Sequence, residues 1–69
     1  MRIVLLEDEI IVVRDLKSRL RTMGYDEVVA YDNGADFLSH IKSKGADLCL
    51  IDIHINGDID GIETVKRMP

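Results

Sequence analysis

Three short apolar runs, separated by longer amphipathic segments, constrain the fold of this chain most strongly. The runs are residues 2–6, 28–31 and 48–51, and turn-forming or polar residues follow each of them. Continuous apolar runs of this length are typical of strands that are covered on both faces of a sheet. Strands that alternate with helices of about 10 to 15 residues form βαβ units around a parallel sheet. The predicted order is therefore strand, helix, strand, helix, strand, helix, with right-handed crossovers.

The segment between the first and second predicted strands has the apolar periodicity of an amphipathic helix. Its apolar residues recur at helical spacing: Val13, Leu16, Leu20 and Met23. This spacing places apolar side chains on one face of a helix. Gly24 follows the last of them, at the position where a left-handed helix cap is expected.

A shorter helix is predicted between the second and third strands, and another after the third. Asn33 is suited to cap the N-terminus of the shorter helix, and Gly45 ends its pattern. The candidates for its apolar face are Leu38 and Ile41, together with Ala35 or Phe37. Ile62 and Val65 indicate the third helix.

Composition narrows the class of protein. The chain has 69 residues, a formal net charge of −4 and a single cysteine, Cys49. A chain of this size buries only about 60% of its unfolded surface, and it has no disulfide or Cys/His zinc cluster to reinforce its core. The acidic balance argues against nucleic-acid binding, and no apolar run approaches the roughly 18 to 20 residues of a membrane span. A lone thiol fits a reducing compartment, so we expect a cytoplasmic domain.

Carboxylates follow two of the predicted strands. Glu7 and Asp8 come directly after the first apolar run, and Asp52 comes directly after the third. Sites in open α/β sheets form beyond the carboxyl ends of the strands, where the strand order switches. If the first and third strands are neighbours, the three carboxylates converge, and a hard divalent cation such as Mg²⁺ relieves their repulsion. The alternative is that these acids merely begin loops and cap helices.

Four motifs, taken in order, resemble the receiver domains of response regulators in two-component signalling. The matching segments are residues 3–9, 31–34, 47–53 and 60–63, and their order and spacing fit the family along the whole of 1–69. The resemblance implies a flavodoxin-like (CheY-like) α/β fold, a doubly wound parallel sheet with strand order 2-1-3. It also implies that the chain is the amino-terminal portion of a receiver, without the family's strands 4 and 5 and helices 4 and 5.

The resemblance also implies a role for individual residues in a Mg²⁺-dependent reaction. Asp52 matches the aspartate that accepts a phosphoryl group from a histidine kinase and that also binds the metal. Asp8 matches the direct Mg²⁺ ligand, Glu7 the acid that reaches the metal through water, and the main-chain carbonyl of His54 the third protein ligand. The implied partner is a sensor histidine kinase or a phosphotransfer protein. The candidate docking residues for it, which are otherwise a solvated helix face, are Arg14, Lys17 and Arg21.

Parts of the family pattern have no counterpart in these residues. The hydroxyl residue of the family's fourth strand and the lysine of its fifth are absent, and Asn56 stands where the family usually has proline. We therefore expect impaired switching. We also expect self-association through the third strand, because an apolar strand at the edge of a sheet exposes unpaired backbone groups.

Two other functions stay open at this point. Residues 52–63 nearly fit an EF-hand calcium loop, with oxygen-bearing side chains at most ligand positions and glycine at the sixth. No amphipathic helix is predicted directly before this segment, which counts against the calcium loop. The chain could also be a passive divalent-metal-binding or interaction module.

Overall fold

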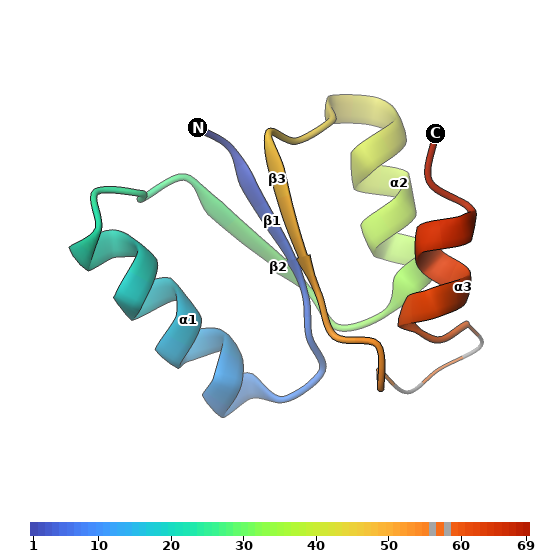
Figure 1. The fold of residues 1–69 in the computed structure, drawn as a ribbon, viewed down its shortest axis with the longest axis horizontal. Helices are drawn as coiled ribbons and strands as arrows, with labels where there is room; N and C mark the ends of the chain where they lie inside the picture. Colours follow the sequence, from blue (N-terminus) through green and yellow to red (C-terminus); the bar gives the residue numbers. More distant parts are fainter. Residues whose placement is uncertain (56, 58) are drawn as a thin grey trace.

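Strands and helices alternate along the chain in the computed structural model, which describes residues 1–55, 57 and 59–69. The elements, labelled in Figure 1, are β1 (Ile3–Leu6), α1 (Ile10–Thr22), β2 (Val28–Tyr31), α2 (Gly34–Lys44), β3 (Leu48–Ile51) and α3 (Gly61–Lys66). The predicted order of strands and helices is confirmed.

The three strands form one parallel sheet in the order β2-β1-β3. Leu6, the last residue of the central strand, is level with Tyr31 of β2 and Ile51 of β3. The carboxyl ends of all three strands therefore lie at one edge of the sheet, at the bottom of Figure 1. The predicted α/β architecture with strand order 2-1-3 is confirmed.

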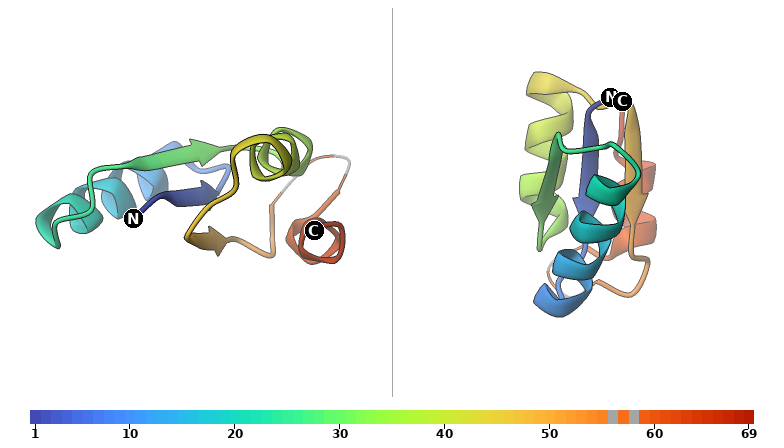
Figure 2. Two further views of the ribbon diagram at one scale, coloured as in Figure 1. Left: turned by 90° about the horizontal axis from the view of Figure 1, so that it is seen from above. Right: turned by 90° about the vertical axis from the view of Figure 1, so that its left-hand side faces the viewer.

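Helices lie on both faces of the sheet, but they cover the two faces unequally. Figures 1 and 2 show α1 on one face and α2 with α3 on the other. The buried cluster lies on the α2 side and consists of Val4, Leu6, Phe37, Leu38 and Ile55. Of the two alternatives for α2, Phe37 is buried and Ala35 is exposed.

The face toward α1 stays partly open. None of the residues of α1, all of which the structure describes, is fully buried. Cys49 and Ile51 pack toward the buried cluster, so Leu48 and Leu50 point to the opposite face, where they are 42% and 36% exposed. The edge strand β3 thus presents apolar side chains beside α1.

The ends of α2 follow the sequence signals. The Asn33 side chain accepts a hydrogen bond of 2.8 Å from the amide of Asp36, as expected of a helix cap. Gly45 ends the helix with a φ of 70°, which the absence of a side chain permits. Among the described residues, no helix is long and apolar enough to cross a membrane.

The third helix buries residues that its periodicity did not indicate. Ile62 and Val65 are half exposed, whereas Gly61 and Thr64 face inward and are buried. Asp60 caps the helix, because its side chain accepts a hydrogen bond of 2.8 Å from the amide of Glu63. The small inward residues allow α3 to begin close to the end of β3.

Candidate metal centre

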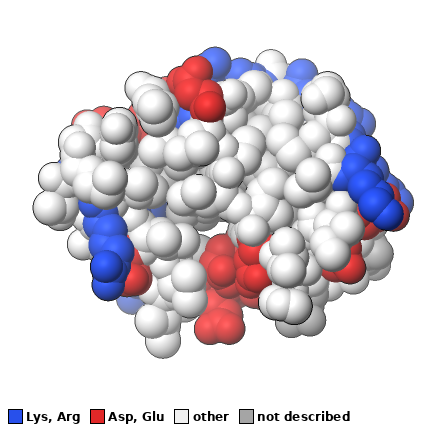
Figure 3. Space-filling view, viewed as in Figure 1, with Lys and Arg blue, Asp and Glu red and all other residues white. Residues whose placement is uncertain are grey.

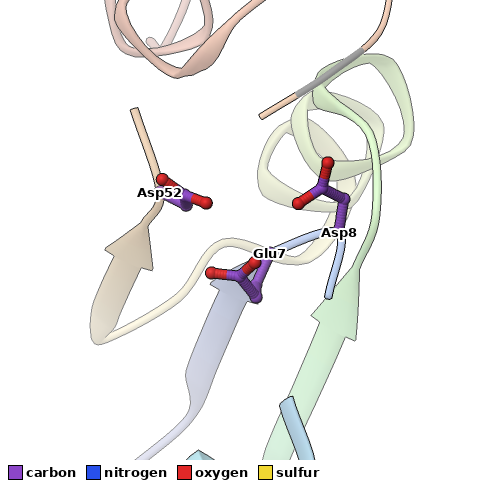
Figure 4. Close-up of side chains that lie close together, drawn as sticks. All are labelled: Glu7, Asp8 and Asp52. Carbon is purple, nitrogen blue, oxygen red and sulfur yellow. The ribbon is translucent and has the colours of Figure 1, made fainter. Parts of the chain in front are cut away.

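Three carboxylates gather at the carboxyl edge of the sheet. Glu7 and Asp8 follow β1, Asp52 follows β3, and one oxygen from each lies within 4.8 Å of the other two (Figure 4). Asp52 is brought to this edge because its amide continues the ladder and donates to the Leu6 carbonyl at 2.9 Å. The central position of β1 therefore puts its two acids beside the acid that ends β3.

Backbone amides orient two of these carboxylates. The amide of Glu9 donates to Glu7 Oε1 at 3.0 Å, and the amide of His54 donates to Asp52 Oδ1 at 2.9 Å. In both cases the donor lies two residues after the acid, which for Asp52 is the pattern of an Asx turn. Sequence reasoning missed these two amides, although an acid at the first position of a loop is a usable signal for such a turn.

The electrostatics of the cluster favour a cation. Partial burial raises the pKa of Glu7, the charges of Asp52 and Asp8 raise it further, and the Glu9 amide acts in the opposite direction. Figure 3 shows acidic side chains gathered in a hollow at the lower edge of the view, where β1 and β3 end. A positive charge at this place would relieve both the repulsion and the cost of burial.

The donor set fits Mg²⁺. Octahedral ligands about 2.1 Å from the ion lie roughly 3 to 4 Å apart, so carboxylate oxygens within 4.8 Å of one another require only small side-chain adjustments. All three residues are partly exposed, which leaves room for the waters that Mg²⁺ retains. Glu7, Asp8 and Asp52 could therefore hold the ion together with solvent.

The segment after Asp52 bears on the remaining ligand and on the calcium-loop alternative. His54 is exposed, and its carbonyl remains the predicted third ligand. The element that precedes Asp52 is the strand β3, whereas an EF-hand loop requires a helix there. Asn56 and Asp58, two oxygen-bearing residues of the calcium-loop hypothesis, lie outside the described residues.

A groove of about 520 Å³ connects the acidic cluster with the basic face of α1. Its lining includes Glu7 and Asp8 on one side and Arg14 and Lys17 on the other. Arg21 lies further along the helix and lines a second, smaller groove, which Lys17 also lines. Two of the three predicted docking residues therefore adjoin the cluster, and the third does not.

The fold and the acidic cluster together define the class of this protein. The protein has an open, parallel α/β sheet, and its acidic site lies at the carboxyl ends of the strands, next to the switch in strand order. The chain matches the response regulator receiver domain over residues 3–69 and belongs to that family. Comparison with curated proteins and with solved structures gave no match.

Family membership confirms the resemblance that the motifs indicated. It assigns the chain a phosphoacceptor role in two-component signalling. Receiver domains generally bind Mg²⁺ at an acidic pocket, and this chain has such a cluster. They generally interact with histidine kinases or phosphotransfer proteins.

Replacing Glu7 by glutamine is expected to stabilise the metal-free fold at neutral pH. Because folding raises the pKa of Glu7 from 4.5, its ionised form opposes folding above the raised value. This cost disappears as the pH falls below 4.5, where Glu7 is protonated in both states. Urea unfolding in EDTA should therefore give the variant the higher midpoint at neutral pH, and the difference should vanish in acid.

The control for this prediction is Glu9→Gln, which removes a charge from an exposed neighbour outside the cluster. Saturating Mg²⁺ should reverse the order of Glu7→Gln and the parent, because the ion stabilises the parent more strongly. Equal midpoints for the two proteins at every pH would contradict a repulsive cluster.

Proposed function

We propose that this chain accepts a phosphoryl group on Asp52 from the phosphohistidine of a sensor histidine kinase or a phosphotransfer protein, in a Mg²⁺-dependent reaction. The observation that carries the proposal is the convergence of Glu7, Asp8 and Asp52 at the edge of a receiver-family sheet. The reaction takes place in the cytoplasm.

The transfer needs a nucleophile that is fixed and a site that tolerates charge. A carboxylate oxygen of Asp52 attacks phosphorus, the bond from phosphorus to the donor's imidazole nitrogen breaks, and its electron pair stays on that nitrogen. The amide of His54 holds the other carboxylate oxygen and so limits rotation of the nucleophile. Mg²⁺, when bound, would supply positive charge that offsets the negative charge of the phosphoryl oxygens. Water later attacks phosphorus, the bond from phosphorus to the Asp52 oxygen breaks, and inorganic phosphate is released from the restored carboxylate.

The ligand assignment in this proposal has three parts. Asp8 and Asp52 would hold the metal directly, Glu7 would reach it through water, and the carbonyl of His54 would complete the protein ligands. The proposal is supported by the donor set, which is entirely oxygen and carries a surplus of negative charge.

Acetyl phosphate, a small phosphodonor, tests the proposal without a partner protein. With Mg²⁺ it should add the mass of a single phosphoryl group to the intact chain, in a product that survives acid and is cleaved by hydroxylamine. EDTA should lower the rate by about 10² or more, because the charge that stabilises the transition state is removed. Absence of the mass gain with Mg²⁺ present would contradict the proposal.

The same measurement separates the alternative function. A passive divalent-metal-binding or interaction module would bind Mg²⁺ and show no mass gain. Switching after phosphorylation is expected to be impaired in residues 1–69, which contain no counterpart of the family's strand-four hydroxyl and strand-five lysine. Uptake is therefore expected to be slow, since each missing electrostatic donor typically costs about 10² in rate.

Reversing the charge of Arg14 and Lys17 together is expected to slow transfer from the cognate kinase by about tenfold or more. The groove beside the acidic cluster joins these side chains to the site, and complementary charge mainly accelerates encounter. Arg21→Glu is a control matched in charge to each single reversal, because Arg21 is exposed and lies outside this groove. Stopped-flow or quench-flow transfer assays should show the difference, and the rate with acetyl phosphate, which makes no contact with a docking surface, should fall less than the rate with the kinase.

We also propose that the open edge of β3 mediates self-association. Leu48 and Leu50 are exposed there, and an edge strand presents unpaired backbone groups to a second chain. Light scattering should show a mass that rises with concentration, and Leu50→Lys should lower it. A monodisperse monomer across the whole concentration range would contradict this proposal.

A further inference from the structure

We infer that Gly61 is a positioning residue for Asp52. Because Gly61 has no side chain, the first turn of α3 lies directly on the Asp52–Ile53 peptide and fixes the direction of the Asp52 carboxylate. The inference rests on the proposed function, since it explains how the phosphoacceptor is held.

The contact between Gly61 and this peptide leaves no room for a side chain. Gly61 is the first residue of α3 and is buried. A β-carbon there would lie 2.5 Å from the Cα of Ile53 and 2.9 Å from the carbonyl carbon of Asp52, and closer still to the Asp52 carbonyl oxygen. Carbon atoms in favourable contact lie about 3.5 to 4.0 Å apart. All three atoms belong to the backbone, so the overlap cannot be relieved by rotating a side chain.

The peptide under Gly61 also determines where the Asp52 carboxylate points. On one side, the Asp52 amide is bound to the Leu6 carbonyl of the sheet at 2.9 Å. On the other side, the His54 amide binds Asp52 Oδ1 at 2.9 Å. The intervening peptide connects these two anchors, so moving it rotates the carboxylate relative to Glu7. Gly61 thus adds a third contact that holds Asp52 in place, after the Leu6 carbonyl and the His54 amide.

Contacts of its own hold α3 in place, so a side chain at position 61 would displace the Asp52–Ile53 peptide rather than the helix. Asp60 caps the helix, and the buried Thr64 hydroxyl donates to the Asp60 carbonyl at 2.7 Å. On the side away from Asp52, α3 and the segment before it lie against α2, because a β-carbon on Gly34 would lie 2.7 and 2.8 Å from side-chain carbons of Ile59. Ile53, in the loop after β3, is exposed, so we expect this loop to move more readily than the helix.

Gly34 offers a matched control for Gly61. Both glycines are buried and begin a helix, and alanine would create an overlap at either. The overlap at Gly34 is with the side chains of Thr64 and Ile59, whereas the overlap at Gly61 is with the backbone of Asp52 and Ile53. Gly34→Ala therefore strains the packing of α3 against α2 without a direct overlap with the Asp52 peptide.

The experiment compares Gly61→Ala, Gly34→Ala and the parent chain. The initial rate of uptake from acetyl phosphate and the Mg²⁺ dissociation constant are measured by mass spectrometry and NMR titration, each corrected for the folded fraction. Gly61→Ala should lower the rate by about 10 to 100-fold, because a displacement near 1 Å costs a reaction of this kind up to about 10². It should weaken Mg²⁺ binding by about fivefold or more and shift the metal-free amide resonances of Ile53 and His54. Gly34→Ala should change both values by less than about twofold.

Two results would overturn the inference. One is a folded Gly61→Ala whose rate and dissociation constant stay within about twofold of the parent; the other is an equal loss in Gly34→Ala. If Gly61→Ala unfolds in buffer, the three proteins are compared in trimethylamine N-oxide, which favours the compact state. If the parent takes up no phosphoryl group, the proposed function fails, while Mg²⁺ binding and the amide resonances still decide the role of Gly61.

Discussion

Replacing Asp52 by asparagine is expected to abolish uptake of a phosphoryl group from acetyl phosphate, lowering the rate by at least about 10³-fold. The amide oxygen of asparagine is neutral and a poor nucleophile, and the variant also removes one charge from the metal cluster. The substitution keeps the shape of the side chain, so the His54 amide retains an acceptor. Mass spectrometry of the intact chain with Mg²⁺ present measures the loss.

Asp47→Asn is the control for this variant. Asp47 is exposed and lies at the opposite end of β3, where its side chain accepts a hydrogen bond of 2.7 Å from the Arg2 amide. The Asp47→Asn variant removes the same charge from the chain and leaves the acidic cluster intact, so its rate of phosphoryl uptake should match that of the parent within about twofold. A phosphoryl group still found on the Asp52→Asn protein would place the acceptor at another residue.

Replacing Phe37 by alanine is expected to lower the free energy of unfolding more than any other substitution considered for this protein. Phe37 is the largest side chain of the core and has no exposed surface, and such truncations cost about 3 to 5 kcal/mol. Domains have about 0.05 to 0.15 kcal/mol of stability per residue, which gives roughly 3 to 10 kcal/mol for 69 residues. The loss therefore consumes much or all of the free energy of unfolding. Urea titration followed by far-UV circular dichroism measures it.

Ile11→Ala is the matched control, because Ile11 is 78% exposed on α1. Its removal should change the free energy of unfolding by less than about 0.5 kcal/mol. Equal losses in the two variants would show that the core does not depend on the cluster around Phe37.

The order of strands and helices could be predicted because each element carries its own local signal. Asn33 and Gly45 bound α2 through a side-chain oxygen and a positive φ, which are properties of single residues. The face that α3 buries could not be predicted in the same way. Thr64 is buried because α2 approaches it, and this neighbour leaves no trace in the periodicity of the helix.

Some parts of the candidate site could likewise be predicted from the sequence, and other parts could not. The convergence of Glu7, Asp8 and Asp52 follows from parallel pairing, which brings the carboxyl ends of neighbouring strands to one edge. The role proposed for Gly61 could not be predicted, because glycine has no functional group that indicates a role in a site. The separation of Arg21 from the groove likewise depends on how far α1 extends beside the sheet.

The central position of β1 has a consequence for how the protein folds. Ile3 is level with Leu48, so β1 cannot pair its second edge until β3 has been synthesised. Pairings between residues so distant in sequence form slowly, because the intervening chain loses entropy before the contact is made. The two halves of the acidic cluster come together in that same late step. The appearance of metal affinity during refolding would therefore report when β1 pairs with β3.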